Sequence, residues 1–258
     1  MTEVVRYEIV EDWIAVVTID RPDKRNAVNA DVAQGLAAAV TRSEADDKVR
    51  VVILRSSGDQ VFSAGADLKA VSEGRGKELY VDGFGFGGFV EAPRRKPWIA
   101  AVAGQALAGG MELTLACDMI VASEEAMFGL PEPKRGLLAG AGGVTRLSKI
   151  VPRNVATEII ITGDPITAAR AYELGLVNRV VPTGGHIEAA LGLARQIAVN
   201  APLAVQGGLA LARQAVDLSD ADGMRAGDAA IAVLRNSEDW NEGPRAFVEK
   251  RAPVWTGR

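Results

Sequence analysis

The chain has 258 residues, of which 48% are hydrophobic and 24% charged, a composition that supplies a large core and is typical of a globular protein. Its formal net charge of −4 and its lack of a basic patch exclude a nucleic-acid-binding class. The single cysteine excludes an internal disulfide and indicates a reducing compartment. Residues 1–13 resemble neither a signal peptide nor a transit sequence, so we expect a cytoplasmic protein.

The first elements in chain order predict a strand, a helix and a second strand. Residues 13–20 are apolar and β-branched and precede a turn sequence, as a strand requires. Asn29 then begins a helical pattern in which Val32 and Leu36 share one face. Residues 49–57 form the second buried strand. Because a helix between two strands provides a crossover, we expect the two strands to pair in parallel.

Later segments extend the same pattern toward a helical carboxyl end. Residues 62–71 contain a glycine turn followed by a helical segment, and 98–104 and 117–124 are further strands. From residue 187 onward the pattern is mainly helical. We therefore expect an α/β core over residues 1–185 and a helical region over 186–258 that packs with it.

Two segments carry patterns that are typical of other classes of protein. Residues 98–117 carry one charge in a span of transmembrane length, but the Gly109-Gly110 pair breaks the span and Glu112 would be costly inside a bilayer. We expect a buried strand, turn and helix instead.

Residues 82–89 match the dinucleotide pattern G-x-G-x-x-G, which must open a helix. The two prolines that follow forbid a helix there. We interpret this segment as a flexible loop whose aromatic side chains could line an apolar cleft: Phe84, Phe86 and Phe89.

A carboxylate lies just inside a buried run, because Glu112 follows the glycine turn by two residues. A helix beginning near Gly109 leaves its first N–H groups without internal partners, and its dipole favours negative charge. Two interpretations remain open. Glu112 either caps its own helix, or faces a ligand whose developing oxyanion the Gly109 amide holds.

Two further features favour the second interpretation. The turn FSAGAD places the amide of Ala66 after another glycine, and two amides converging on one oxygen form an oxyanion hole, each donor contributing ~3–4 kcal/mol in the transition state. Glu132 lies between two prolines, on a backbone that can form neither a regular helix nor a central strand. Two acids at one pocket separate in pKa, one acting as an acid and the other as a base.

Other chemistries have few candidate residues. His186 is the only histidine, and no G-x-S-x-G sequence is present, which argues against a serine hydrolase. No His/Cys cluster has the spacing of a metal site, so we expect no metal. Cys117 lies in an apolar run and is interpreted as a small buried hydrophobe.

Six segments together carry a family resemblance: residues 21–29, 62–69, 106–118, 128–147, 161–181 and 247–255. On these the chain resembles the enoyl-CoA hydratase/isomerase, or crotonase, family over nearly all its length. The resemblance implies an α/β spiral of ββα units with a helical C-terminal region that forms a homotrimer, often a dimer of trimers. It implies an acyl-CoA thioester substrate, with coenzyme A as part of the substrate and no separate cofactor, and no membrane partner.

The resemblance also implies a role for each of four residues. The amides of Ala66 and Gly109 would bind the thioester carbonyl. Glu112 would help deprotonate a water molecule for attack at Cβ, and Glu132 would deliver a proton to Cα. Family isomerases typically lack the acid that matches Glu112, so the presence of both acids favours hydration.

CoA is polyanionic, and an acidic protein needs local cations to bind it. Lys24, Arg25 and Lys69 are candidates, and Lys250 could reach the CoA of a neighbouring subunit; the alternative for each is a solvated surface cation. The remaining substrate-binding positions implied by the resemblance are Ala64, Asp67, Leu68 and Leu130, with Asp67 expected to act mainly as a local backbone partner.

Three functions remain open at this point. The first is a hydratase of 2-enoyl-CoA. The second is another reaction on acyl-CoA, such as isomerisation, dehydration or hydrolysis, because a fold does not choose its chemistry. The third is a non-catalytic acyl-CoA-binding protein, which would have no need for both acids.

Overall fold

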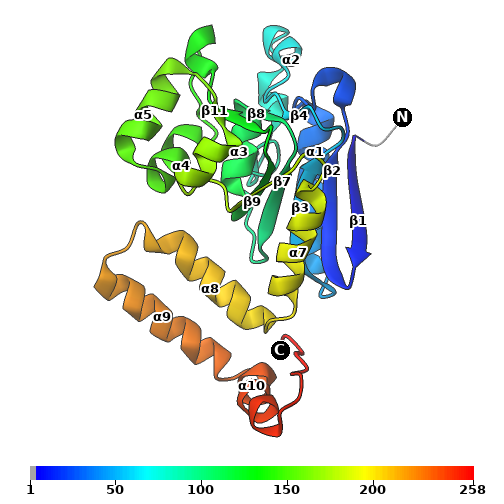
Figure 1. Ribbon diagram of the computed structural model, residues 1–258, viewed down its shortest axis with the longest axis vertical. Coiled ribbons are helices and arrows are strands. Elements are labelled where there is room, and N and C mark those ends of the chain that lie inside the picture. Colours follow the sequence, from blue (N-terminus) through cyan, green and yellow to red (C-terminus); the bar gives the residue numbers. More distant parts are fainter. Residues whose placement is uncertain (1–3) are drawn as a thin grey trace.

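The computed structural model describes residues 4–258, so the first three residues of the expected core lie outside it. Two main sheets form the body of the molecule (Figure 1). The larger sheet contains, in spatial order, β1 (Val5–Glu11), β2 (Trp13–Ile19), β3 (Val49–Ser56), β7 (Trp98–Val102), β9 (Met119–Ser123) and β12 (Arg179–Val181). The smaller contains β11 (Ile166–Thr167), β10 (Met127–Gly129), β8 (Gln105–Leu107) and β4 (Val61–Ser63).

The chain alternates between these two sheets as it advances. β3 in the larger sheet leads to β4 in the smaller, β7 leads to β8 and β9 leads to β10, and the strands of successive units pair in parallel. Helix α2 (Leu68–Ser72) follows the first of these strand pairs and α3 (Gly109–Ala116) follows the second. This repetition of strand, strand and helix is the α/β spiral that the family resemblance implies.

The parallel pairing of the first two predicted strands is confirmed, with Val17 of β2 opposite Leu54 of β3. Between them runs α1 (Ala30–Ala45), and Asn29 caps it by accepting a hydrogen bond from the Val32 amide at 3.1 Å. A carboxamide at this position satisfies one of the amides that a helix start leaves unpaired.

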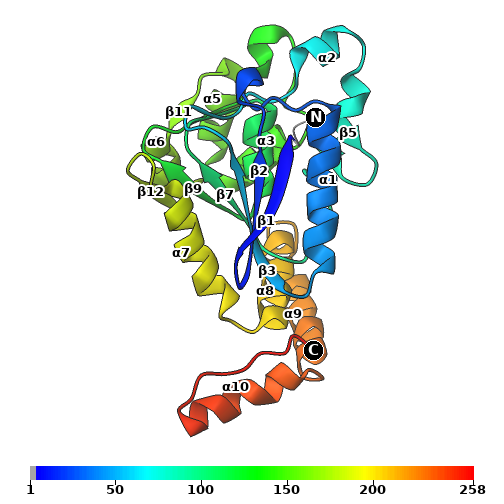
Figure 2. The same cartoon turned by 90° about the vertical axis from the view of Figure 1, so that its right-hand side faces the viewer.

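Helices α1 and α7 (His186–Ala198) cover opposite faces of the larger sheet (Figure 2). Because side chains alternate along a strand, Ala15 and Val17 of β2 pack in the cluster that contains α1. Ile14 and Val16 pack with residues of α7. The first helix of the predicted C-terminal region therefore lies directly on the sheet.

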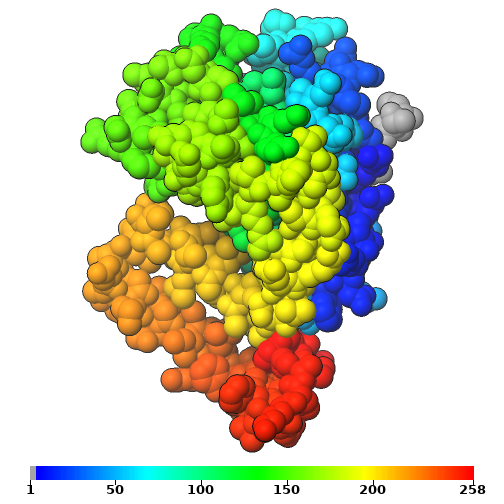
Figure 3. All heavy atoms as spheres, viewed as in Figure 1, coloured from blue at the N-terminus to red at the C-terminus, as the bar shows by residue number. Residues whose placement is uncertain are grey.

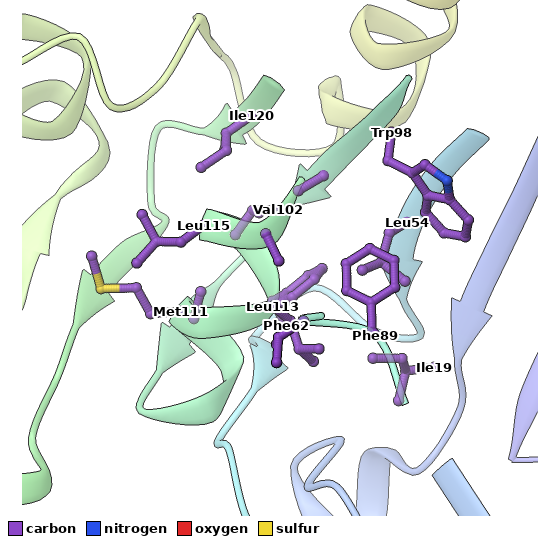
Figure 4. Close-up of a cluster of buried hydrophobic side chains, with 14 of the residues drawn as sticks. Ile19, Leu54, Phe62, Phe89, Trp98, Val102, Met111, Leu113, Leu115 and Ile120 are labelled. Carbon is purple, nitrogen blue, oxygen red and sulfur yellow. The ribbon is translucent and has the colours of Figure 1, made fainter. Parts of the chain in front are cut away.

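Helix α3 lies inside the core, and all eight of its residues are buried. Met111, Leu113 and Leu115 all pack in the main hydrophobic core (Figure 4), as expected for a mainly apolar helix that is buried all round. The same core contains Phe89, whose ring meets Trp98 edge-on at a centroid distance of 4.9 Å. The expectation that Phe89 lines a cleft is therefore wrong, because the turn after β6 directs it into the core.

The middle of the chain adds short elements around these sheets. They are the hairpin strands β5 (Tyr80–Val81) and β6 (Gly85–Phe86), and the helices α4 (Gly143–Ile150), α5 (Arg153–Thr162) and α6 (Ala168–Glu173). The hairpin replaces the flexible loop expected at residues 82–89.

Helices α8 (Pro202–Ala215), α9 (Asp220–Leu234) and α10 (Glu238–Glu249) extend away from the body, as Figures 1 and 3 show. Within the described residues, neither α8 nor α9 contains a buried side chain. Across residues 4–258 no helix combines the length and the apolar character needed to span a membrane.

Candidate active site

A cleft of about 730 Å³ lies where the smaller sheet passes into α2 and α3. Most of the residues that the sequence singles out line it: Lys24, Arg25, Ala64, Ala66, Asp67, Leu68, Lys69, Gly109, Glu112 and Glu132. Positions from four separate segments of the chain therefore meet at one concave surface, which is the usual form of a small-molecule site.

The backbone around Ala66 directs its amide toward this cleft. The Gly65 carbonyl accepts a hydrogen bond from the Val28 amide, and the Asp67 amide donates to the Val28 carbonyl, both at 2.8 Å. The C=O and N–H of one trans peptide point in opposite directions. The Ala66 amide therefore points away from Val28, on the side of the cleft that Ala66 lines.

The amide of Gly109 is held at the start of α3 by a strained residue. Ala108 has φ 52° and ψ −129°, a conformation that a residue with a side chain rarely adopts. Its amide donates to the Gly129 carbonyl at 2.9 Å, and its carbonyl accepts from the Glu112 amide at 3.1 Å. Because that carbonyl points along the helix, the Gly109 amide points out of the helix start, without an intrahelical partner.

The two amide-bearing turns touch each other. A Cβ atom added to Gly65 would lie 2.6 Å from the Gly109 nitrogen, and one added to Gly109 would lie 2.5 Å from the ring of Phe86. Only glycine permits this approach. The contact brings the Ala66 and Gly109 amides to the same end of the cleft, which is the arrangement that an oxyanion hole requires.

Glu112 is 4% exposed and accepts a hydrogen bond from the Gly143 amide through Oε1 at 2.9 Å. The partner is the first residue of α4, so the interpretation of Glu112 as a cap of its own helix is wrong. Burial raises the pKa of Glu112 above its ordinary value, while the Gly143 amide and the Arg146 charge act in the opposite direction. The carboxyl is therefore placed by a neighbouring element, with its second oxygen left for another partner.

Glu132 begins a single 3-10 turn, η3 (Glu132–Arg135), with prolines on both sides. It is 8% exposed, and its Oε2 has no hydrogen-bond partner in residues 4–258. Burial raises the pKa of Glu132 to about 7, and the charge of Glu112 adds to the increase. A carboxyl that is half protonated at neutral pH can donate a proton as a general acid.

Asp67 has the local role that the sequence predicts, because its side chain caps α2 by accepting the Lys69 amide at 3.1 Å. It also forms an ion pair with Arg21 at 3.2 Å. These contacts fix the helix that carries Leu68 and Lys69 to the rim of the cleft. Lys24 and Arg25 line the same cleft, as the last residue and the C-cap of the 3-10 turn η1 (Pro22–Lys24).

Two predicted substrate-binding residues lie elsewhere. Leu130 is fully buried in the core, and a Cβ on Gly143 would meet its side chain at 3.0 Å. The expectation that Leu130 lines the cleft is therefore wrong, because the backbone of α4 lies against its side chain. Lys250 is the C-cap residue of α10, and α10 lies at the opposite end of the molecule from α2 (Figure 1). Its contact with a neighbouring subunit's CoA stays a prediction.

The cleft also contains residues that sequence reasoning did not select: Leu79, Tyr80, Leu107, Arg135, Leu137 and Leu138. Of the three aromatic residues expected at a cleft, Phe86 lines this one. Its ring meets that of Tyr80 edge-on, with ring centroids 5.6 Å apart. Leu138 is 74% exposed. In the sequence, only the apolar pair Leu137 and Leu138 after the PEPKRG segment could have indicated a cleft wall.

Comparison with known proteins gives a consistent result. The family model described as enoyl-CoA hydratase/isomerase matches residues 10–258. A carnitinyl-CoA dehydratase of Salmonella typhi is 41% identical over 251 residues, which cover 95% of each chain. The crystal structure of an enoyl-CoA hydratase from Mycobacterium tuberculosis has a TM-score of 0.95 at 43% identity, covering 99% of this chain and 100% of that one. A carnitinyl-CoA hydratase from Mycobacterium avium has a TM-score of 0.79 at 45% identity, with both chains covered completely. The chain therefore belongs to the enoyl-CoA hydratase/isomerase, or crotonase, family of enzymes.

Proposed function

We propose that the protein adds water reversibly across the 2,3 double bond of a 2-enoyl-CoA thioester. One observation carries this proposal: two buried carboxyls, Glu112 and Glu132, line the same cleft as the amides of Ala66 and Gly109. Burying two acids without paired cations is unfavourable for stability, so their joint presence indicates selection for chemistry.

The amides act on the acyl group. The thioester oxygen accepts hydrogen bonds from Ala66 and Gly109, and negative charge moves onto this oxygen as water attacks Cβ and an enolate forms. Donors already in place stabilise that charge without reorganising at the moment of reaction.

The carboxyls handle the protons. Oε1 of Glu112 is occupied by the Gly143 amide, which leaves Oε2 to accept a hydrogen bond from the attacking water and then its proton. Glu132, with a pKa of about 7, is substantially protonated at neutral pH and donates its proton to Cα. Holding water and substrate between two acids replaces an unfavourable encounter with hydroxide.

Coenzyme A enters as part of the substrate, and we propose no separate cofactor. Lys24, Arg25 and Lys69 line the cleft and offer positive charge to the phosphates of CoA, on a chain whose formal net charge is −4. The apolar side chains of Leu137 and Leu138 offer a surface to the acyl chain.

Dehydration of a 3-hydroxyacyl-CoA is the second candidate. The 41% identity to a carnitinyl-CoA dehydratase supports it, and the same two acids serve the reverse direction because each step is reversible. Isomerisation needs one acid only, and a non-catalytic binding protein needs neither, so the pair Glu112 and Glu132 argues against both.

The test is turnover of crotonyl-CoA, followed as loss of the absorbance of its conjugated thioester. We expect Glu112→Gln and Glu132→Gln to lower kcat by about 100- to 10,000-fold each, while Glu158→Gln, on the exposed face of α5, retains the wild-type rate. A higher kcat/KM for dehydration of carnitinyl-CoA than of 3-hydroxybutyryl-CoA would favour the second candidate. Unchanged absorbance with every acyl-CoA would overturn the proposal.

A further inference from the structure

Arg146 lies behind the loop that supports Glu112. This support loop, residues 139–143, ends at the Gly143 amide that donates to Glu112. The Arg146 guanidinium donates from Nη1 to the Ala141 carbonyl at 3.1 Å, and from Nη2 to the Val90 carbonyl. Its own amide donates to the Gly142 carbonyl at 2.9 Å. One side chain therefore ties the support loop to a second segment of the chain.

The support loop passes directly between the guanidinium and the catalytic carboxyl. A Cβ on Gly142 would lie 1.8 Å from Nη1 of Arg146, and a Cβ on Gly143 would lie 3.0 Å from Oε1 of Glu112. Gly142 also has φ 102°, which strongly favours glycine. A side chain at Gly142 would displace the Arg146 guanidinium, and one at Gly143 would crowd the Glu112 carboxyl.

The second segment follows the β5–β6 hairpin, which contributes Phe86 to the cleft wall. Val90 follows the hairpin that carries Phe86, and the Phe86 ring lies against Gly109. The contact from Arg146 to the Val90 carbonyl therefore joins the support of Glu112 to the segment that follows Phe86.

We propose that Arg146 is a positioning residue for the hydration reaction: it holds the support loop so that the Gly143 amide fixes Glu112 toward the cleft. This inference rests on the proposed function. The guanidinium does not reach the substrate itself, because the support loop separates it from the cleft.

Charge and geometry act together at this position. The charged groups acting on Glu112 are Arg146 from α4 and Glu132 from η3, and Tyr80 is the titratable group facing it from β5. Glu91 faces the guanidinium as well. Burial raises the pKa of Glu112, and the Gly143 and Ala141 amides and, to a smaller extent, the Arg146 charge lower it. Losing the guanidinium should therefore raise the pKa of Glu112 and reduce the fraction that can act as a base near neutral pH.

The space around Arg146 permits chemical rescue. A separate cavity of about 370 Å³ is lined by Arg146, Glu91 and Lys149, and shares Gly140 and Ala141 with the main cleft. The support loop is the wall between the two cavities. A guanidinium ion added to an Arg146→Ala variant has an open approach to the vacated position.

The kinetic experiment uses the full chain with crotonyl-CoA. For Arg146→Met we expect kcat to fall by about 10- to 100-fold, with KM little changed and the acidic limb of the kcat/KM profile moved to higher pH. Arg146→Lys keeps the charge and should lose less, with its acidic limb near that of wild type. Lys149→Met removes a cation one turn along the same helix, whose ion pair within residues 4–258 is with Asp217 on the surface, and should retain the wild-type profile.

Two measurements separate this inference from the proposed function. Carbon-13 NMR titration of the Glu112 carboxyl needs no substrate, and should give a higher pKa in Arg146→Met than in wild type. Guanidinium ion should restore kcat to Arg146→Ala but not to Glu112→Gln. The inference is overturned by an unchanged Glu112 titration in Arg146→Met, by an unaltered kcat, or by equal effects of guanidinium on both variants. If wild type turns over no acyl-CoA, the proposed function fails while the titration still tests the position of Arg146.

Discussion

Single residues in this site owe their chemistry to burial. Glu132 has an ordinary side chain, but its oxygen Oε2 is buried without a partner in the described chain, and burial raises its pKa to about 7. A prolyl residue on each side prevents the backbone from relaxing toward solvent. The same burial that suits Glu132 to donate a proton makes its charged form unfavourable for folding.

Glu132→Gln should therefore stabilise the protein at alkaline pH while it abolishes most turnover. The folded carboxyl binds its proton more tightly than the unfolded one, whose pKa is near 4.5. Stability is complete below the unfolded value and is lost as pH rises from there through about 7. Glutamine mimics the protonated form, so we expect a gain on the order of 1 kcal/mol at pH 8, or about 2–4 °C in Tm.

Thermal unfolding at pH 4.5 and pH 8 measures this gain. At the lower pH the variant and the wild type should unfold at nearly the same temperature. Glu158→Gln, on the surface of α5, is the matched control and should show no gain at either pH. A Glu132→Gln protein that is less stable than wild type at pH 8 would contradict a raised pKa.

At the scale of elements, two turns generate the pair of amides. The turn after β4 and the turn before α3 each place a glycine at the point of contact, and Gly65 adopts φ 86° there. The close approach of Gly65 to the Gly109 nitrogen means that neither turn can change without moving the other. The oxyanion hole is a property of this contact and not of either turn alone.

Gly65→Ala should consequently separate the two amides. The added methyl group would lie 2.6 Å from the Gly109 nitrogen, and we expect kcat to fall by about 100-fold or more, as for loss of one oxyanion donor. Gly58→Ala is the matched control, because Gly58 has φ 76° and nothing within 4 Å of an added Cβ.

The two substitutions share the backbone penalty of about 1–2 kcal/mol for a positive φ and differ in the steric contact. Kinetics with crotonyl-CoA and thermal unfolding of both variants separate the two effects. Equal losses of kcat in Gly65→Ala and Gly58→Ala would show that strain, and not displacement of the amide, is responsible.

At the scale of the whole molecule, the C-terminal helices lack a complete environment within one chain. α8 and α9 have no buried residue in the described part of the chain, and Val233 of α9 is 68% exposed. Apolar helices that extend from a folded body need a further surface to cover them. We predict that a homotrimer, or a dimer of trimers, provides it.

Sedimentation equilibrium at micromolar concentration tests this prediction. Wild type should sediment as three or six chains, and Val233→Glu should dissociate it. Ile161→Glu, at an equally exposed position on α5, is the control and should leave the assembly intact. A monomeric wild type, or equal dissociation by both substitutions, would contradict the predicted role of the C-terminal region.

Local signals account for the parts of this fold that were predictable. The strands at β2, β3, β7 and β9 are mainly apolar and β-branched. Asn29 and Asp67 cap helices by accepting hydrogen bonds from amides two or three residues away. The start of α3 follows from its glycine pair. By contrast, the three-residue strands β4, β8 and β10 are too short to show a period, so their pairing in a second sheet was not predictable.

The sequence by itself determined which chemical groups the site contains: two acids on constrained backbone and two amides after glycines. Only the tertiary structure decided which groups meet. In the folded chain, Phe89 and Leu130 lie in the core. Glu112 accepts a hydrogen bond from α4, and Arg146 donates to the loop that precedes that helix. The physical reason is the separation in sequence between interacting residues. Caps and turns depend on neighbours along the chain, whereas burial, pKa and the contact of two turns depend on distant segments that only the folded chain brings together.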